Sequence, residues 1–522
     1  MITNKYVFIT GTTGLLGAYL LRDLLAAGQS CATMVRSNRF ENGVQRIESI
    51  LARFEKDNGI ILPRPVVFEG DLSKPMFGFN EFELTWIKEH CDTVLHNAAS
   101  LSFQLDDKTN EPYRSNVNGT ENILKFCEET GIRQFHHVST SYICGLRTNT
   151  CFESELDVGQ EFGNDYEKSK VTAEKLVRSA TFLESLTVYR PAIIIGDSNN
   201  GYTSTFHGYY TPLKIVHSFV DTDSIVDGAP LLALLGLTGT ERKHFVPVDW
   251  ISAAIVRILT TPQNHGKTYH LTPKNPTTCE TTLHVFEQAL KMYTLKMQNK
   301  NQNKNQNKNN CNDKSIAVNQ SNSNSNELGI SMIGDVFREQ MEVYKAYWRD
   351  DPIFDRTNTE TVLSDLPCPE VTPEMLLRMA MYSLENGFGW PKPQPIKPEN
   401  WIHDFLYKKS SSVNNWNRIE QLHQDRVDNI ESFGLQVNGS GGGAWTINYN
   451  AENKKLEYNK GLPTDNKTII YVNANTFNHI IVNKYSFNDA LKSGGIHIEN
   501  STQNGINICK KFLQELIVNN CQ

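Results

Sequence analysis

The feature that most constrains the fold is a set of three glycines near the N-terminus, Gly11, Gly14 and Gly17. They follow a short apolar strand, Tyr6–Ile9, and open a helix expected over Leu15–Ala27. Gly11 makes the tight turn, Gly14 lets the main chain approach a pyrophosphate, and Gly17 lets the helix pack closely against the strand. The positive end of the helix faces the phosphates. This pattern predicts a dinucleotide-binding βαβ unit rather than an ordinary structural turn.

The residues of this turn and the end of the next strand define the expected cofactor contacts. A second buried strand is expected over Ser30–Val35, and Arg36 follows it. An acidic residue at this position binds the ribose 2′-hydroxyl of NAD, whereas an arginine accommodates the 2′-phosphate of NADP. Arg36 therefore favours NADP, and the alternative is a solvated cation at the strand end. The expected contacts from the glycine turn are Gly11, Thr13, Gly14, Leu15, Leu16 and Gly17.

Further strands are expected at Pro65–Glu69, Thr93–His96 and Phe135–Val138, with helices between them, the longest over Thr109–Thr130. Strands that alternate with helices predict a doubly wound parallel α/β sheet. Small or polar residues after the first two of these strands are further cofactor contacts: Asp71, which can reach the adenine amino group, Leu72, Asn97, Ala98 and Ala99.

A tyrosine and a lysine four residues apart, Tyr166 and Lys170, lie one turn apart on one face of an expected helix. A cation beside a phenol lowers the phenol pKa from about 10, which makes the tyrosine usable as an acid. Taken alone, this spacing occurs by chance on many surface helices. Two features favour a chemical pair: the glycine turn in the same α/β unit, and the hydroxyl residue Thr140 just after a strand.

With these motifs in order, the first ~270 residues resemble an extended short-chain dehydrogenase/reductase with a Rossmann sheet. The matching segments are Gly11-x-x-Gly14-x-x-Gly17, Asp71-Leu72, Asn97-Ala98-Ala99, Val138-Ser139-Thr140, Tyr166-x-x-x-Lys170 and Tyr189-Arg190-Pro191. Within that family the texts HVSTSYICG, YRPAIIIGDS and HFVPVDWISAAIV are most similar to the thioester reductase and fatty acyl-CoA reductase branch.

The resemblance implies roles for individual residues. Thr140 would supply the catalytic hydroxyl, Tyr166 the proton, and Lys170 would orient the nicotinamide ribose, with Pro191 beside the cofactor. Ser139 and Ser141 are near enough to remain alternatives to Thr140. The implied reaction is NADP-dependent reduction of an acyl thioester, bound to a carrier protein or to CoA, to an aldehyde or an alcohol.

Other functions remain open on this fold. The same Tyr-Lys pair serves alcohol and hydroxysteroid dehydrogenases and sugar-nucleotide epimerases, and a non-catalytic protein that binds NADP or lipid is a third alternative. Beyond Pro191, an aromatic cluster of Phe206, Tyr209 and Tyr210 surrounds His207. Aromatic walls suit an acyl chain or a ring, while the alternative is core packing around a hydrogen-bonded core histidine.

Changes in composition set the domain boundaries. We expect an NADP-binding domain over 1–295 and a disordered Asn/Gln/Lys-rich insertion over 296–327, where nothing can form a core. The rest of the substrate lobe is expected over 328–409, beginning with a helix at Val336–Trp348. Over 434–522, alternating apolar residues and short helices predict a small α+β domain that resembles a sterol-carrier-protein-like lipid-binding domain, with a purely structural appendage as the alternative.

The net charge, the hydropathy and the cysteine content exclude several classes of partner and site. A net charge of −7 without a basic stripe argues against nucleic acid, and no apolar run approaches the ~20 residues of a membrane span. The ten cysteines include no C-x-x-C pair, so we expect them to be core residues and expect no metal site. The absence of such pairs and a first strand that starts almost at Met1 predict a cytoplasmic location. Because no carrier-attachment motif is present, a carrier-bound acyl substrate would arrive from a separate protein.

Overall fold

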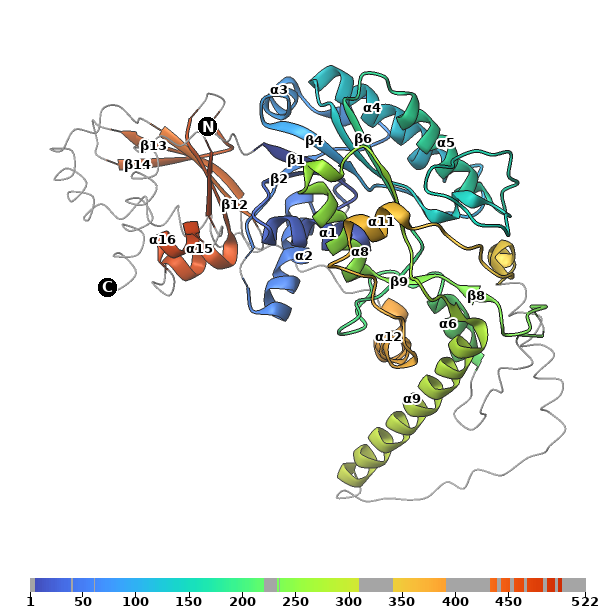
Figure 1. Ribbon diagram of the computed structural model, residues 1–522. Coiled ribbons are helices and arrows are strands. Elements are labelled where there is room, and N and C mark those ends of the chain that lie inside the picture. Colours follow the sequence, from blue (N-terminus) through green and yellow to red (C-terminus); the bar gives the residue numbers. More distant parts are fainter. Residues whose placement is uncertain are drawn as a thin grey trace.

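The computed structural model in Figure 1 contains a large N-terminal α/β part, a second lobe beneath it and a small C-terminal sheet. It describes residues 5–38, 41–60, 62–219, 232–233, 235–308 and 341–390. In the C-terminal part it describes residues 432–438, 443–450, 455–463, 467–481, 486–492 and 496–499.

A seven-stranded parallel sheet forms the centre of the N-terminal part, in the order β10-β6-β5-β4-β1-β2-β3. Its strands are β1 (Tyr6–Thr10), β2 (Cys31–Val35), β3 (Val66–Glu69), β4 (Cys91–His96), β5 (Gln134–Val138), β6 (Ser185–Pro191) and β10 (Thr268–Leu271). The strand order reverses between β1 and β4, and ligands of such sheets bind at the carboxyl ends of the strands beside that reversal. The doubly wound α/β fold expected from the sequence is confirmed.

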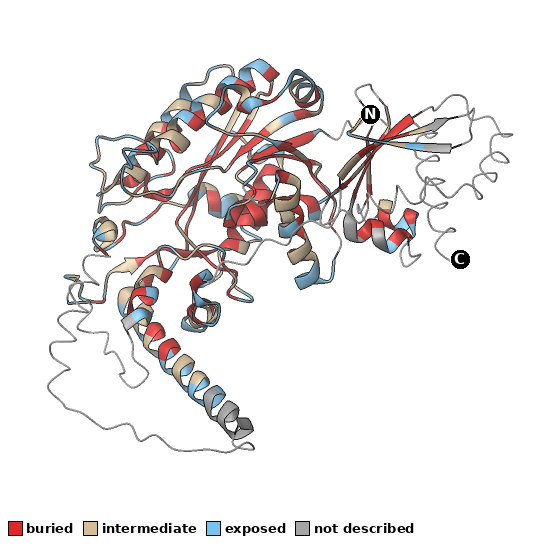
Figure 2. Cartoon of the chain, turned by 180° about the vertical axis from the view of Figure 1, so that it is seen from behind, coloured by how far each residue is buried: buried red, intermediate tan, exposed pale blue. Residues whose placement is uncertain are grey.

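Helices cover both faces of this sheet (Figures 1 and 2). On one face pack α1 (Leu15–Ala26), α2 (Gly43–Asn58) and α8 (Val248–Leu259). On the other pack α3 (Glu81–His90), α4 (Gly119–Thr130) and α5 (Asp165–Ser179). Along β1, Val7 and Ile9 join the first cluster and Tyr6 and Phe8 join the second, because successive side chains of a strand point to opposite faces.

The helix expected over Thr109–Thr130 differs from the observed one. After Pro112 the chain forms a π turn, η2 (Arg114–Asn118), and continues as α4. Proline fits only the first turn of a helix, since it has no N–H to donate. Within the π turn Asn116 accepts a hydrogen bond from Ser100 N at 2.7 Å and donates one to Ser169 Oγ at 2.9 Å, so it ties α5 to the loop after β4.

The second lobe joins two short sheets with a cluster of helices. β7 (Ile193–Ile195) pairs with β9 (Phe245–Pro247), and β8 (Arg242–Lys243) pairs with β11 (Thr277–Thr278). Its helices are α6 (Tyr210–Phe219), α9 (Cys279–Lys308) and α12 (Pro373–Glu385), while α11 (Thr357–Val362) packs against β10 of the central sheet. Short turns complete the two N-terminal lobes: η1 (Pro75–Gly78), η3 (Ser141–Cys144), η4 (Pro262–Asn264), η5 (Glu342–Tyr347) and η6 (Gly387–Gly389).

Two boundaries around the expected insertion differ from the sequence-based ones. The helix α9 runs to Lys308, into the stretch 296–327 that was expected to be disordered. Lysine and glutamine tolerate a helix well, and extending a helix that is already packed needs no new nucleus. Residues 309–340 lie outside the described residues. Of the helix expected over Val336–Trp348, the described residues begin at Met341, which is helical, and Glu342–Tyr347 form the 3-10 turn η5.

A separate five-stranded sheet forms the C-terminal part, in the order β14-β13-β12-β15-β16. Its elements are β12 (Ser432–Asn438), β13 (Gly443–Asn450), β14 (Lys455–Lys460), β15 (Ile469–Asn473), α15 (Ala474–Ile481), α16 (Phe487–Lys492) and β16 (Ile496–Glu499). One apolar cluster joins the sheet to both helices. The expected α+β organisation is therefore confirmed, while the expected final helix over 509–517 lies outside the described residues.

The strand β16 contacts the edge of the Rossmann part. Glu499 accepts hydrogen bonds from Trp86 Nε1 and from Tyr471 Oη, and His90 Nε2 lies 3.6 Å from its carboxylate. The cysteines in the described part of the chain are all free thiols. Among the described helices, none has the length and apolar character needed to cross a bilayer.

Candidate active site

A single cavity of about 850 Å³ opens at the carboxyl ends of the central strands and continues into the second lobe. Every site residue expected from the sequence lines it, except Gly17: Gly11, Thr13, Gly14, Leu15, Leu16, Arg36, Asp71, Leu72, Asn97, Ala98, Ala99, Thr140, Tyr166, Lys170 and Pro191. The structure thus brings together residues from six strand ends and from α5.

The glycine turn has the geometry that a dinucleotide requires. Gly11 has a φ of +77°, and a Cβ there would lie 2.7 Å from Ala98 N. A Cβ on Gly17 would lie 2.0 Å from the Gly11 carbonyl oxygen, so Gly17 serves helix packing and does not reach the cavity. At Gly14 the nearest atom to a Cβ is 3.4 Å away, and no side chain caps the start of α1. The helix N–H groups therefore face free space where a pyrophosphate fits.

The hydroxyl of Thr10 holds the loop after β4 beside the glycine turn. Thr10 Oγ1 accepts hydrogen bonds from Asn97 N at 3.2 Å and from Ala98 N at 3.1 Å. The Asn97 side-chain amide donates to the Gly11 carbonyl at 3.3 Å. These bonds hold the loop after β4 against the glycine turn.

Two arginines converge at the adenosine end of the cavity. Arg36 follows β2, and Arg46 comes from the first turns of α2 and donates a hydrogen bond to the Arg36 carbonyl. Burial lowers the pKa of Arg46, and the Arg36 cation lowers it further. Nearby, burial raises the pKa of Asp71, but hydrogen bonds from Ser73 and the charge of Arg36 hold it below its usual value. Sequence reasoning missed Arg46, whose signal is an arginine in the helix that follows the second strand.

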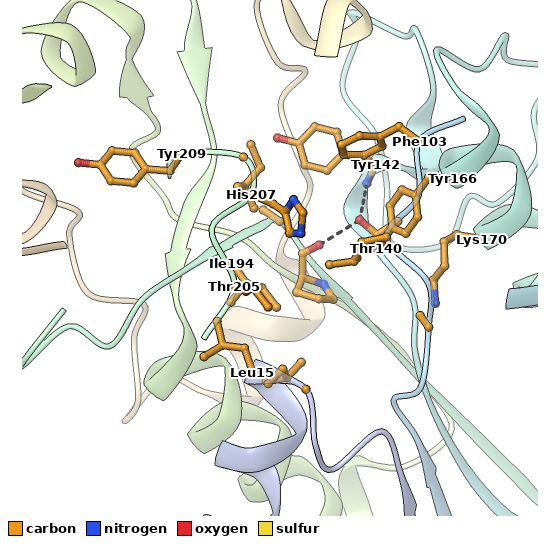
Figure 3. A pocket seen from close by; sticks show the side chains of 18 of the residues that line it. Leu15, Phe103, Thr140, Tyr142, Tyr166, Lys170, Ile194, Thr205, His207 and Tyr209 are labelled. Atoms are coloured by element: carbon orange, nitrogen blue, oxygen red, sulfur yellow. Dashed lines mark hydrogen bonds between the residues drawn. The ribbon is translucent and has the colours of Figure 1, made fainter. Parts of the chain in front are cut away.

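The three expected catalytic residues meet where the cofactor half of the cavity joins the substrate half (Figure 3). Thr140 begins the turn η3, where its Oγ1 accepts from Tyr142 N at 3.3 Å and donates to the Pro191 carbonyl at 3.4 Å. Lys170 Nζ donates to the Val138 carbonyl at 2.8 Å. The arrangement places a hydroxyl, a phenol and an ammonium around one open volume.

The two serines beside Thr140 are placed differently. Ser139 Oγ donates to Glu174 Oε2 at 2.8 Å, so its hydroxyl belongs to a buried ion network. Ser141 Oγ is buried and has no partner within the described residues, and Ser141 does not line the large cavity. The geometry therefore favours Thr140 among the three hydroxyls.

The phenol of Tyr166 is less acidic than the sequence suggested. Burial raises the pKa of Tyr166 to about 12, and a hydrogen bond with Thr140 lowers it by less. Burial also lowers the pKa of Lys170 to about 8, which Glu174 partly opposes. The expected lowering of the Tyr166 pKa is wrong for this structure, because burial raises it more than the Thr140 hydrogen bond lowers it, while the Lys170 ammonium is held at the Val138 carbonyl.

Aromatic side chains from distant segments surround Tyr166. Phe103, from the loop after β4, has its ring centre 5.8 Å from that of Tyr166 and 5.5 Å from that of Tyr347. Tyr344 stacks edge-on against Phe103 at 5.2 Å. Trp348 lines the same cavity, and its buried Nε1 has no hydrogen-bond partner among the described residues. Sequence reasoning missed this wall because its members are separated by more than two hundred residues, including the insertion.

The expected aromatic cluster around His207 divides between cavity and core. Tyr209 and His207 line the cavity, and Tyr209 Oη donates to the Leu376 carbonyl at 2.8 Å. Tyr210 Oη instead accepts from Gly196 N at 2.8 Å in the core, and Phe206 packs on Phe388. Within the described residues, no group of three or more His, Cys, Asp or Glu side chains is placed to hold a metal ion.

Comparison with known proteins gives consistent likenesses. Residues 9–255 match the family described as Male sterility protein. The chain is 26% identical over 287 residues to the nonribosomal peptide synthetase asaC of Aspergillus flavus, covering 52% of this chain and 26% of that protein. It is 24% identical over 286 residues to the fatty acyl-CoA reductase wat of Drosophila melanogaster, and the match covers 48% of this chain and 53% of that protein. The structure of the terminal R domain from the myxalamid PKS-NRPS pathway superposes on this chain with a TM-score of 0.55 and 23% sequence identity. The superposition covers 75% of this chain and 92% of the R domain.

These likenesses bear on the N-terminal two lobes. They confirm the resemblance to extended short-chain dehydrogenase/reductases, a family of oxidoreductases, and to its thioester reductase and fatty acyl-CoA reductase branch. The chain spans about a quarter of the length of the first curated relatives it matches, at 26% each. The resemblance of the C-terminal part to sterol carrier proteins stays a prediction.

Proposed function

We propose that this chain, whose residues 9–255 match the Male sterility family, is an NADP-dependent reductase of an acyl thioester. The observation that carries the proposal is the placement of Thr140, Tyr166 and Lys170 at the junction between a dinucleotide-shaped and an aromatic half of one cavity. NADPH would supply the hydride. Thr140 and Tyr166 would donate hydrogen bonds to the acyl oxygen as it gains negative charge, and Lys170 would orient the cofactor ribose.

The charge at the adenosine end supports NADP as the cofactor. Arg36 and Arg46 are close enough for the Arg36 cation to lower the Arg46 pKa, so an anion between them would relieve their repulsion. The 2′-phosphate of NADP is such an anion, and NAD has none. The other cofactor contacts would be the cavity-lining residues of the glycine turn with Asp71, Leu72, Asn97, Ala98, Ala99 and Pro191.

The likenesses support an acyl thioester as the substrate class. One relative is named for nonribosomal peptide synthesis and another for fatty acyl-CoA reduction, so a carrier-bound or CoA-bound thioester fits both names. The carrier would be a separate protein, and the reaction would take place in the cytoplasm. The product would be the aldehyde or, after a second reduction, the alcohol.

For the C-terminal part we propose a sterol-carrier-like role in binding an apolar ligand. The support is its apolar cluster between the five-stranded sheet and α15 and α16. Titration of the full chain with a fluorescent fatty-acid analogue should give saturable binding, and Trp445→Ala should weaken it, because Trp445 belongs to that cluster. Unchanged binding in the variant would contradict this role.

The substrate class is tested by following NADPH oxidation with a medium-chain acyl-CoA, a carrier-bound acyl thioester, a ketosteroid and a nucleotide sugar. We expect turnover with at least one thioester and identify the aldehyde or alcohol by mass spectrometry. Turnover with only the ketosteroid or the nucleotide sugar would favour the dehydrogenase or epimerase alternatives instead.

A further inference from the structure

The second-lobe half of the cavity contains a histidine whose ring nitrogens form no hydrogen bond to a described residue. His207 lines the cavity, and Figure 3 shows its ring facing Thr140 on the side away from Lys170. Among the described residues, neither ring nitrogen of His207 has a hydrogen-bond partner, and burial lowers its pKa, with Lys214 adding to that effect. The ring is therefore neutral near pH 7 and has one N–H to donate.

This placement differs from that of two histidines in the sheet, His96 and His136. His96 bonds Thr10 Oγ1 at 2.9 Å, and His136 bonds Tyr189 Oη at 2.8 Å, so both rings are satisfied inside the core. From the sequence, a hydrogen-bonded core histidine was the favoured interpretation of His207. In the structure its side chain is instead exposed to the cavity.

The backbone around His207 is held by its neighbours. Gly208 has a φ of +55°, which side-chain-bearing residues rarely adopt, and a Cβ there would lie 3.1 Å from Ile193 Cγ2. The His207 carbonyl accepts from Tyr210 N at 3.2 Å, and the neighbouring Tyr209 is anchored to α12 through Leu376. These contacts fix the backbone position from which the imidazole enters the cavity.

Thioester reduction needs a hydrogen-bond donor that aldehyde reduction does not. After hydride addition, Tyr166 gives its proton to the oxygen, which forms a hemithioacetal. When the carbon–sulfur bond breaks, its electron pair leaves with sulfur as a thiolate, the carbonyl reforms and the oxygen returns the proton to Tyr166. The thiolate then takes one proton from water. In a cavity lined largely by apolar side chains, such an anion is costly without a donor.

The proposed reaction assigns Thr140 and Tyr166 to the acyl oxygen, and the ammonium of Lys243, which also lines the cavity, is held by Asp351 at 3.0 Å. Building on the proposed thioester reduction, we propose that His207 is a further catalytic residue whose ring N–H donates a hydrogen bond to the departing thioester sulfur.

The test is a single-turnover reaction of the full chain with NADPH and a medium-chain acyl-CoA, in which NADPH absorbance and free thiol are followed together. In His207→Leu, thiol release should fall about tenfold or more, the size of one hydrogen bond to a charged group, and should lag behind NADPH loss. Reduction of the aldehyde of the same chain length should stay within about threefold, since it releases no sulfur. His207→Gln keeps an N–H donor and should restore most of the rate.

The matched control is His217→Leu, because His217 lies on α6 against Tyr293 and does not line the cavity. Equal slowing of thioester and aldehyde, or thiol release that keeps pace with NADPH loss in His207→Leu, would overturn the role of His207. If His207→Leu fails to fold, His207→Ala removes the same donor and is judged by the same criteria. Failure of the unaltered chain to release thiol would instead contradict the proposed function.

Discussion

At the scale of single residues, the proposed preference for NADP rests on two side chains that the fold brings together. Arg36 is adjacent to its strand, and its place could be predicted from the sequence because the second strand of such a unit ends beside the adenosine ribose. Arg46 reaches the same point from α2. Both cations surround the position that a 2′-phosphate would occupy.

The first prediction is that NADPH binds at least tenfold more tightly than NADH, a difference of about 1.4 kcal/mol. Arg36→Asp should erase this preference, because it replaces the phosphate partner with a like charge. Isothermal titration with both cofactors measures it. Lys125→Asp, an equal charge change on the exposed side of α4, should leave the preference intact. Equal affinity of the unaltered chain for both cofactors would refute the assignment.

Residues whose function depends on local chain geometry could be predicted from the sequence, whereas residues recruited by tertiary packing could not. Gly11 and Gly17 act within the glycine turn itself. A Cβ added at either position would come too close to neighbouring backbone atoms, as the predicted roles of these glycines require. Phe103 and Tyr347 meet only after the second lobe has folded. The pKa of Tyr166 was predicted in the wrong direction, because a sequence does not show how deeply a phenol is buried.

At the scale of elements, a buried ion network ties α5 to the strands beside it. Glu174 of α5 accepts hydrogen bonds from Arg190 Nη2 of β6 at 2.6 Å and from Ser139 Oγ after β5 at 2.8 Å. Burial raises the pKa of Glu174, but Arg190 and Arg178 together hold it below its usual value. This network positions the helix that carries Tyr166 and Lys170.

We expect Glu174→Gln to lower the free energy of unfolding by about 3–5 kcal/mol, because it leaves the Arg190 guanidinium buried without a counter-charge. Urea unfolding at neutral pH measures this. Lys175→Gln, which removes an exposed ion pair with Asp157, should cost no more than about 1 kcal/mol. Since the folded-state pKa of Glu174 is depressed, its contribution is present at neutral pH and is lost as the pH falls through that pKa. A loss in Glu174→Gln no larger than in the control would contradict this view.

At the scale of the whole molecule, the reacting volume belongs to two lobes. The Rossmann part supplies Thr140, Tyr166 and Lys170, and the second lobe supplies His207 from before α9 and Tyr347 from after it. Figure 1 shows α9 extending beyond the second lobe, and the first half of α9 packs against α12. The general fold was predictable from strand and helix periodicity, but the lining of the cavity by Tyr344, Tyr347 and Trp348, far along the chain from Tyr166, was not.

The most direct test of the account is the single-turnover rate of NADPH oxidation with a medium-chain acyl-CoA in the unaltered chain and in Tyr166→Phe. The substitution keeps the ring and its packing against Phe103 but removes the proton donor. We predict that NADPH affinity is retained while the rate falls by about 10²–10⁴-fold, the usual contribution of a general acid. Full activity in Tyr166→Phe would remove this residue from the chemistry and contradict the proposed mechanism.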